Sequence, residues 1–183
     1  MMHVMLDLET LSTRPNAAII AIGAVAFDPE RMEVLTTFEA RIRPSSAHHY
    51  DRHLEMETLA WWMHQPDAVR AQWDEGGMIL PEALSDFVDW LHFFWPGEVT
   101  AVWGNGAAFD NVVLRDACRA VKGSAPWSYK QDRCYRTLRA LFPHIEEPPF
   151  EGERHTALAD ALHQAKHCMR LLAALRTEAQ PHA

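Results

Sequence analysis

The 183-residue sequence is short of cysteine. Its three cysteines, Cys118, Cys134 and Cys168, are odd in number and widely spaced, and no two form a Cys-x-x-Cys pair. A secreted disulfide framework needs paired cysteines, and a cysteine zinc site needs close ligand spacing. The sequence therefore indicates neither kind of site, and we expect three packed thiols.

The sequence also lacks an excess of basic charge. Lysine and arginine number 17 against 25 aspartates and glutamates, which gives a formal net charge of −8. A protein that tracks long duplexes through many phosphate contacts usually displays a strongly basic face. Any nucleic acid would have to be gripped locally by this chain. Acidic charge gathered at a divalent-cation site would explain part of the imbalance.

Long apolar runs are missing as well. The longest run, Ala17–Phe27, has eleven residues, which is too few to span a bilayer. Residues 1–8 lack both the basic start and the long apolar core of a signal peptide. We therefore expect a cytoplasmic protein with no membrane partner. Because the length suits one domain and no linker divides the chain, we expect a single domain over 1–178 and a frayed tail over 179–183, with fraying beginning after Arg176.

Hydrophobic spacing predicts strands in the first third of the chain and then helices that alternate with further strands. A turn signal at 28–31 joins two of the early strands into an antiparallel hairpin. Leu59, Trp62 and Met63 are expected on one side of the first helix. The predicted strands are 3–8, 17–27, 34–42 and 99–103, with a further short one near 129; the predicted helices begin near 55, 81, 110 and 156, with one more ending near 141. This order describes an α/β fold with a mixed central sheet flanked by helices.

Two acidic residues end the first predicted strand. Alternation along a strand sends Asp7 and Glu9 to the same face and Leu8 to the other. Two carboxylates this close repel each other, so a site that keeps both ionised normally supplies a cation. Hard oxygen ligands favour magnesium or manganese. Taken alone, the pair could equally be a solvated strand terminus.

Two further motifs place charged residues at helix starts. Asp110 follows a strand and a glycine-containing turn, and it could be a simple helix N-cap. His155 precedes the last predicted helix, and Asp160 lies five residues on, along the same side. His155 could be an ordinary cap and Asp160 an ordinary residue of the polar face. Each motif has a plain structural explanation when taken separately.

The order and separation of these motifs resemble those of the DEDDh 3′-to-5′ exonucleases, a superfamily with a ribonuclease H-like fold. The residues that match its three motifs are Asp7, Glu9, Asp110, His155 and Asp160. Within the superfamily, the segments 7–11, 18–28 and 58–62, with Gln65, look most like a bacterial and phage subgroup that includes exonuclease VIII-like and mycobacterial-type 3′-to-5′ exoribonucleases. The resemblance implies a mixed sheet with three antiparallel strands first and parallel strands after them.

The resemblance also implies roles for the five residues. A pair of divalent cations, Mg²⁺ or Mn²⁺, would hold the attacking and leaving oxygens of an in-line displacement. Asp7 would bridge both cations, Glu9 and Asp160 would complete the site of the nucleophilic one, and Asp110 would serve the other. His155 would be the general base, because imidazole ordinarily titrates near neutral pH.

The implied substrate is the 3′ end of single-stranded RNA or DNA, and the implied products are nucleoside 5′-monophosphates. In relatives, the backbone at the position of Thr10 meets the terminal 3′ hydroxyl, and the residue at Leu11 wedges against the last base. Phe109 would line the same pocket, although Leu11 and Phe109 could both be simple core residues. Of the adjacent Trp61 and Trp62, one is expected in the core and the other free for substrate. Many relatives are homodimers, so we expect a homodimer here.

Two alternatives remain open at the level of sequence. One is a proofreading-type subunit that acts only inside a larger complex. The other is a catalytically idle scaffold that binds nucleic-acid ends. Idle relatives commonly lose one of the acids, and this chain keeps all four acids of the motif.

Overall fold

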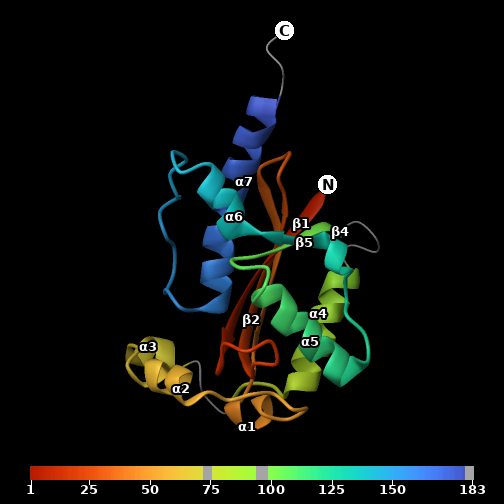
Figure 1. Ribbon diagram of the computed structural model, residues 1–183, viewed down its shortest axis with the longest axis vertical. Coiled ribbons are helices and arrows are strands. Elements are labelled where there is room, and N and C mark those ends of the chain that lie inside the picture. The colour runs from red at the N-terminus through yellow and green to blue at the C-terminus, as the bar shows by residue number, and fades with distance from the viewer. Residues whose placement is uncertain (72–75, 94–98, 180–183) are drawn as a thin grey trace.

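Five strands form one sheet in the order β3-β2-β1-β4-β5 (Figure 1). A computed structural model describes residues 1–71, 76–93 and 99–179 of the chain. The strands are β1 (Met2–Thr10), β2 (Ile19–Asp28), β3 (Glu33–Arg41), β4 (Val99–Gly104) and β5 (Asp132–Cys134). Pairing is antiparallel for β1 with β2 and for β2 with β3, and parallel for β1 with β4 and for β4 with β5. The predicted mixed sheet is confirmed.

The hairpin between β2 and β3 closes as the turn signal predicts. One carboxylate oxygen of Asp28 accepts hydrogen bonds from the backbone N–H groups of Glu30 and Arg31. An aspartate that binds the backbone two and three residues on is a recurrent way to stabilise a turn. The hairpin places β3 beside β2, at one edge of the sheet.

Helices cover both faces of the sheet, with α4 and α5 on one face and α6 and α7 on the other (Figure 1). Their bounds are α1 (Pro44–Ala47), α2 (Met56–Met63), α3 (Asp67–Arg70), α4 (Leu80–Phe93), α5 (Asp110–Lys122), the 3₁₀ turn η2 (Tyr129–Gln131), α6 (Tyr135–Leu141) and α7 (Ala157–Ala179). In the part of the chain that the structure describes, no helix is long and apolar enough to cross a membrane.

Helix α7 runs further than the sequence predicts. Fraying was expected after Arg176, but the helix continues to Ala179, so that expectation is wrong up to this residue. Arg176 donates a hydrogen bond to the backbone oxygen of Pro29 in the β2–β3 turn, which holds the last turns of α7 against the sheet. The remainder of the predicted tail, 180–183, lies outside the described residues.

Alternation along β1 divides the hydrophobic core in two. Val4 and Leu6 pack with α4 and α5, whereas Met5 packs with α6 and α7. Each full burial of such a side chain contributes about 1.5–3 kcal/mol. Because Asp7 and Glu9 share the parity of Met5, their side chains point to the face that α7 covers.

Helix α2 meets the core through a narrow strip. Trp62 is 1% exposed and its indole N–H donates to the backbone oxygen of Thr10, 2.9 Å away. Met63, which was predicted on the same side, is 62% exposed, so that prediction is wrong. Helix α2 lies on the surface and ends at Met63. It contacts the core only around Trp62, so Met63 stays in solvent.

The three cysteines are unpaired. Cys118 and Cys168 are fully buried in the two halves of the core, and burial raises the pKa of the Cys118 thiol to about 12. The prediction of packed thiols is confirmed for these two. Cys134 is half-buried at the end of β5.

Candidate metal and catalytic site

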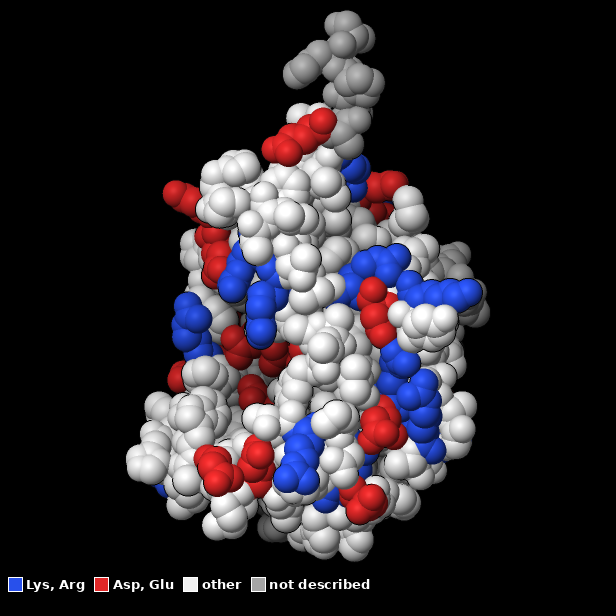
Figure 2. Space-filling view, in the orientation of Figure 1, with Lys and Arg blue, Asp and Glu red and all other residues white. Residues whose placement is uncertain are grey.

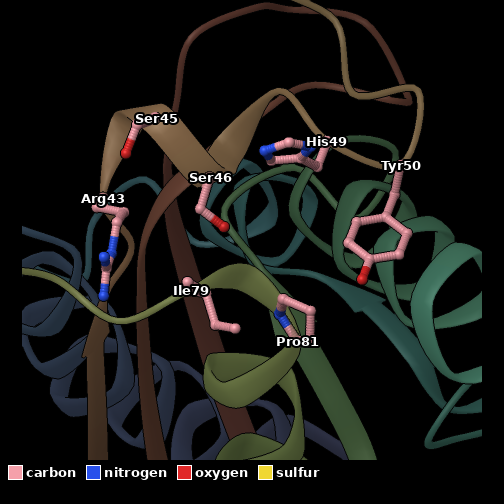
Figure 3. Close-up of a pocket in the computed structure, with 7 residues that line it drawn as sticks. All are labelled: Arg43, Ser45, Ser46, His49, Tyr50, Ile79 and Pro81. Atoms are coloured by element: carbon pink, nitrogen blue, oxygen red, sulfur yellow. The ribbon is translucent and has the colours of Figure 1, made fainter.

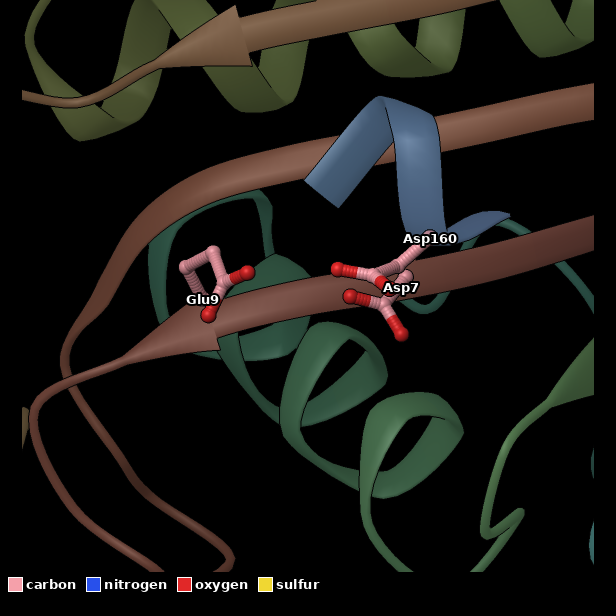
Figure 4. Close-up of side chains that lie close together, drawn as sticks. All are labelled: Asp7, Glu9 and Asp160. Carbon is pink, nitrogen blue, oxygen red and sulfur yellow. The ribbon is translucent and has the colours of Figure 1, made fainter. Parts of the chain in front are cut away.

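Three carboxylates meet between β1 and the start of α7. Asp7 and Glu9 extend from β1, and Asp160 comes down from the first turn of α7 beside Asp7 (Figure 4). One carboxylate oxygen from each of the three lies within 4.8 Å of the other two. Residues 153 positions apart in the chain thus form one cluster, as the motif order predicts.

A glycine on β2 permits this meeting. Gly23 pairs with Asp7 across the β1–β2 ladder. A Cβ atom at Gly23 would lie 2.2 Å from the carbonyl carbon of Ala157, well inside van der Waals contact. Only glycine therefore lets the first turn of α7 rest on the sheet beside Asp7. Sequence reasoning missed this role, although a glycine inside an apolar strand was a visible signal of close backbone approach.

Asp110 lies at the edge of the cluster. It is the first residue of α5, it is 4% exposed, and its carboxylate accepts a hydrogen bond from the N–H of Gly106 at 3.3 Å. Phe109 occupies the N-cap position, so the alternative interpretation of Asp110 as the N-cap is wrong. A Cβ atom at Gly104 would lie 2.9 Å from the Cβ of Asp110, so glycine at the end of β4 makes room for the acid.

The protein surroundings disfavour the ionised form of these acids. Burial raises the pKa of Glu9 to about 8, and the charges of Asp160 and Asp110 add to the increase. The pKa of Asp7 is raised well above its ordinary value by burial and then by its three acidic neighbours. Burial raises the pKa of Asp110 to about 6, against the hydrogen bond from Gly106. A cation among the acids would offset both burial and repulsion.

The donor set suits a hard divalent cation. Every candidate ligand in the cluster is a carboxylate oxygen, and oxygen-only sites favour magnesium, calcium or manganese over the metals that histidine and cysteine select. Burial raises the pKa of Asp160 as well, while the backbone hydrogen bond from His155 lowers it. The residues present therefore fit a divalent cation.

Gln164 is a site residue that sequence reasoning missed. Its side-chain amide N–H donates to Asp7 at 2.8 Å, and the residue is only 7% exposed. Its amide oxygen is buried without a hydrogen-bond partner among the described residues. Gln164 lies four residues after Asp160, on the same side of α7, so the helical spacing could have indicated it.

His155 lies at the mouth of the cluster. Its backbone N–H donates to Asp160 at 2.8 Å, and its φ of 63° places the backbone in the left-handed region. Its side chain is exposed, and the imidazole meets the indole of Trp61 edge-on, with ring centroids 5.3 Å apart and planes at 87°. The structure thus brings His155 to the acids through Asp160 and to α2 through Trp61.

The three predicted substrate contacts differ in their surroundings. Thr10 is 8% exposed and ends β1 beside Glu9, where its backbone oxygen accepts from Trp62. Leu11 is 2% exposed and belongs to the core, so the structure does not bring it to the surface where a base could touch it. Phe109 is half-buried and packs against the same core. The alternative of a simple core role fits Leu11 better than a wedge.

A hollow of about 520 Å³ opens beside Glu9. Its walls come from the end of β1 and from α2, and its lining residues are Leu8, Glu9, Thr10, Thr13, Glu55, Glu57, Thr58, Trp61 and Trp62. Figure 2 shows acidic side chains on the floor of a depression in this region and basic side chains along its margins. Arginine and lysine form strong charge-assisted hydrogen bonds with phosphate oxygens, so the basic margin offers contacts to a phosphate chain.

A second hollow, of about 450 Å³, lies under α1 (Figure 3). Arg43, Ser46, His49 and Tyr50 are among the side chains around it, and no predicted site residue lines it. Glu9, Thr10 and the Trp61 ring line the first hollow, and His155 contacts Trp61. We therefore treat the first hollow as the candidate site.

Comparisons with solved structures show the fold. The nuclease domain of 3′hExo, a DEDDh family member solved bound to rAMP, superposes with a TM-score of 0.63 at 14% identity, covering 94% of this chain and 92% of that one. The Escherichia coli ExoI–ssDNA complex gives a TM-score of 0.63 at 18% identity and covers 97% of this chain but 41% of that one. The predicted ribonuclease H-like fold is confirmed.

Sequence comparisons give the family. An exodeoxyribonuclease of Enterobacteria phage T4 is 27% identical over 134 residues, which covers 67% of this chain. The chain spans 58% of the length of that phage protein. The family model described as the 3′-5′ exoribonuclease Rv2179c-like domain matches residues 2–172. The resemblance recognised in the sequence is therefore correct, and the chain belongs to the family of Rv2179c-like 3′-5′ exoribonuclease domains.

Proposed function

We propose that this chain is a divalent-metal-dependent 3′-to-5′ exonuclease that hydrolyses phosphodiester bonds at the 3′ ends of single-stranded RNA or DNA and releases nucleoside 5′-monophosphates. The observation that carries the proposal is the cluster of Asp7, Glu9 and Asp160 with His155 at its mouth. Membership of an exoribonuclease family and similarity to a phage exodeoxyribonuclease support the reaction class.

Asp7, Glu9 and Asp160, with Asp110 beside them, would hold two cations, either Mg²⁺ or Mn²⁺. When bound, such cations activate water and neutralise the charge that develops on phosphorus. The acids supply a fixed array of oxygens because β1 and α7 are rigid elements. Gln164 orients Asp7 by donating to one of its oxygens.

His155 would accept the proton of the attacking water. Its position on the loop side of α7 leaves the imidazole at the open mouth of the cluster, where solvent can take the proton away. The terminal nucleotide would lie in the hollow beside Glu9, with the backbone of Thr10 near its 3′ hydroxyl and the Trp61 ring as a wall.

The activity can be tested together with the assignment of roles. Purified protein with Mg²⁺ or Mn²⁺ should shorten matched 5′-labelled RNA and DNA oligonucleotides. Asp7→Asn should abolish both the shortening and the thermal stabilisation by Mn²⁺, because it removes a ligand. His155→Ala should slow the shortening by about 100- to 10,000-fold but keep the stabilisation. Equal cleavage by wild type and Asp7→Asn would refute the proposal.

An idle scaffold is less well supported, because all four acids of the motif are present and lie around one site. A scaffold would show no stabilisation by cations. The predicted homodimer and cytoplasmic location stay predictions. Light scattering of the purified protein would test the first and fractionation of cells the second.

A further inference from the structure

Trp61 lies between the hollow and His155. Its side chain lines the hollow beside Glu9, it is 44% exposed, and its ring meets the imidazole of His155 at 5.3 Å. The indole of a half-exposed tryptophan offers a large, rigid apolar face that can contact a neighbouring ring. The contact with His155 crosses from α2 to the loop before α7, two elements far apart in the chain.

Trp61 and the helix that carries it, α2, are held firmly in place. The Trp61 ring packs edge-on against buried Trp62, with centroids 5.0 Å apart. Trp62 in turn donates to the backbone oxygen of Thr10. The Glu55 carboxylate, just before α2, accepts from the backbone N–H of Thr13 at 3.1 Å. These bonds fix α2 to the end of β1, which is the strand that carries Glu9.

On the other side of the contact, the backbone of His155 and the loop before it are tied to α7. The N–H of His155 donates to Asp160, and the preceding loop is tied to α7 by a hydrogen bond between His163 and Glu147 and by the ion pair of Glu151 with Lys166. The imidazole itself is exposed on this loop. Holding a rotatable side chain in one rotamer costs entropy, and a ring contact that favours this rotamer offsets part of the cost.

We propose that Trp61 is a positioning residue for His155: its indole restricts the imidazole to the rotamers that face the acidic cluster. This inference rests on the proposed function. The indole does not touch the reacting atoms; it acts by raising the fraction of molecules in which His155 is placed for proton transfer. A displacement of about 1 Å at such a group can cost about 100-fold in rate.

A double-mutant cycle tests this role. Trp61→Ala should lower kcat by about 10- to 100-fold. Trp61→Phe should keep most of the wild-type kcat, because a phenyl ring can also meet the imidazole edge-on. In a His155→Ala background, Trp61→Ala should lower the residual kcat no further, because a residue that acts through His155 has nothing left to position. Additive effects of the two substitutions would overturn the inference, as would a rise in KM with kcat unchanged.

Two controls separate positioning from loss of structure. Met63→Ala removes another exposed side chain from the same helix and should leave kcat unchanged. Trp61→Ala should keep the thermal stabilisation by Mn²⁺, since the carboxylates are untouched. Loss of that stabilisation would mean that the site itself has collapsed, which would also overturn the inference.

The contact has a readout that needs no activity. The ring current of Trp61 should displace the proton NMR resonance of the His155 imidazole, which the His155→Ala spectrum identifies. Trp61→Ala should return this resonance to the position of a solvated histidine. An undisplaced resonance in the wild type would overturn the inference even if the protein cleaved no oligonucleotide, whereas a displaced resonance in an inactive protein would count against the proposed function alone.

Discussion

At the scale of single residues, the site depends on side chains that the catalytic motif does not include. Asp7 is a sequence-predicted ligand, but the group that orients it is Gln164, one helical turn beyond Asp160. A hydrogen-bond partner such as Gln164 fixes the orientation of a metal-binding carboxylate. The amide oxygen of Gln164 is buried and has no hydrogen-bond partner among the described residues.

Replacing Gln164 should therefore weaken cation binding. We expect Gln164→Leu, which keeps the size but removes the amide, to lower the affinity for Mn²⁺ by about 10- to 100-fold. Calorimetric titration of metal-free protein measures this directly. Gln65→Leu, at a half-buried position just after the end of α2 and outside the acidic cluster, is the matched control and should leave the affinity unchanged. An affinity equal to that of the wild type in Gln164→Leu would contradict the role of Gln164.

The acids also predict how stability responds to pH. The pKa of Glu9 is raised from 4.5 to about 8, so the folded state holds a proton that the unfolded state releases between these values. Without metal, stability should fall as pH rises from about 4.5 to 8. Burial lowers the pKa of His3 to about 4, which acts in the opposite sense below pH 6.5. Between pH 6.5 and 8, the change in stability therefore reports on the acids without the opposing effect of His3.

In that window, the melting temperature of metal-free protein should decrease, and the increase caused by Mn²⁺ should be larger at pH 8 than at pH 6.5, because protons compete with the cation. Thermal unfolding with and without Mn²⁺ gives both values. Glu9→Gln should flatten the decrease. If Mn²⁺ raised the melting temperature more at pH 6.5 than at pH 8, the ion would not be bound by the ionised carboxylates of the cluster.

At the scale of secondary-structure elements, the site depends on the short distance between α7 and the strands β1 and β2. Strand alternation predicts that Asp7 and Glu9 share a face, and helical spacing predicts that Asp160 faces the sheet. Neither pattern contains the distance between the elements, which Gly23 sets through its missing side chain. For the same reason the sequence could not show that Leu11 is enclosed by the core.

A side chain at Gly23 should push the start of α7 off the sheet. We expect Gly23→Ala to separate Asp160 from Asp7, because the new Cβ would meet backbone atoms of Ala157 that cannot move alone. The variant should lose about 1–3 kcal/mol of stability and most of its stabilisation by Mn²⁺. Ala24→Gly, at the neighbouring position on the other face, should cost stability but keep the metal response. A normal response in Gly23→Ala would contradict this account of the helix position.

At the scale of the whole molecule, the net charge of −8 limits how the protein can hold nucleic acid. Arg136 and Arg154 are among the cations whose charges reach the acids, since they lower the pKa of Asp110 and of Asp160 respectively. Arg154 also lies over the ring of Phe150 at 4.4 Å. The composition predicted local binding, and the structure has these arginines at the cluster, but their positions could not be derived from composition.

Binding of single strands should therefore depend weakly on salt. With two phosphate contacts, the logarithm of the binding constant should fall by about 1.4 for each tenfold rise in salt concentration. Fluorescence anisotropy of a labelled oligonucleotide with the inactive Asp7→Asn variant measures this slope, and Arg136→Gln with Arg154→Gln should bring it close to zero. A slope several times steeper would indicate an extended basic track and contradict local binding.

A time course of product lengths tests most directly whether the carboxylate cluster removes nucleotides from the 3′ end. A 5′-labelled single strand, incubated with Mg²⁺ or Mn²⁺, should give a ladder that shortens by one nucleotide at a time, with nucleoside 5′-monophosphates as the other product. Asp7→Asn, purified identically, should give no ladder, nor should the wild type with chelator. Immediate release of the labelled 5′ nucleotide, internal cuts, or an unchanged ladder from Asp7→Asn would contradict the account.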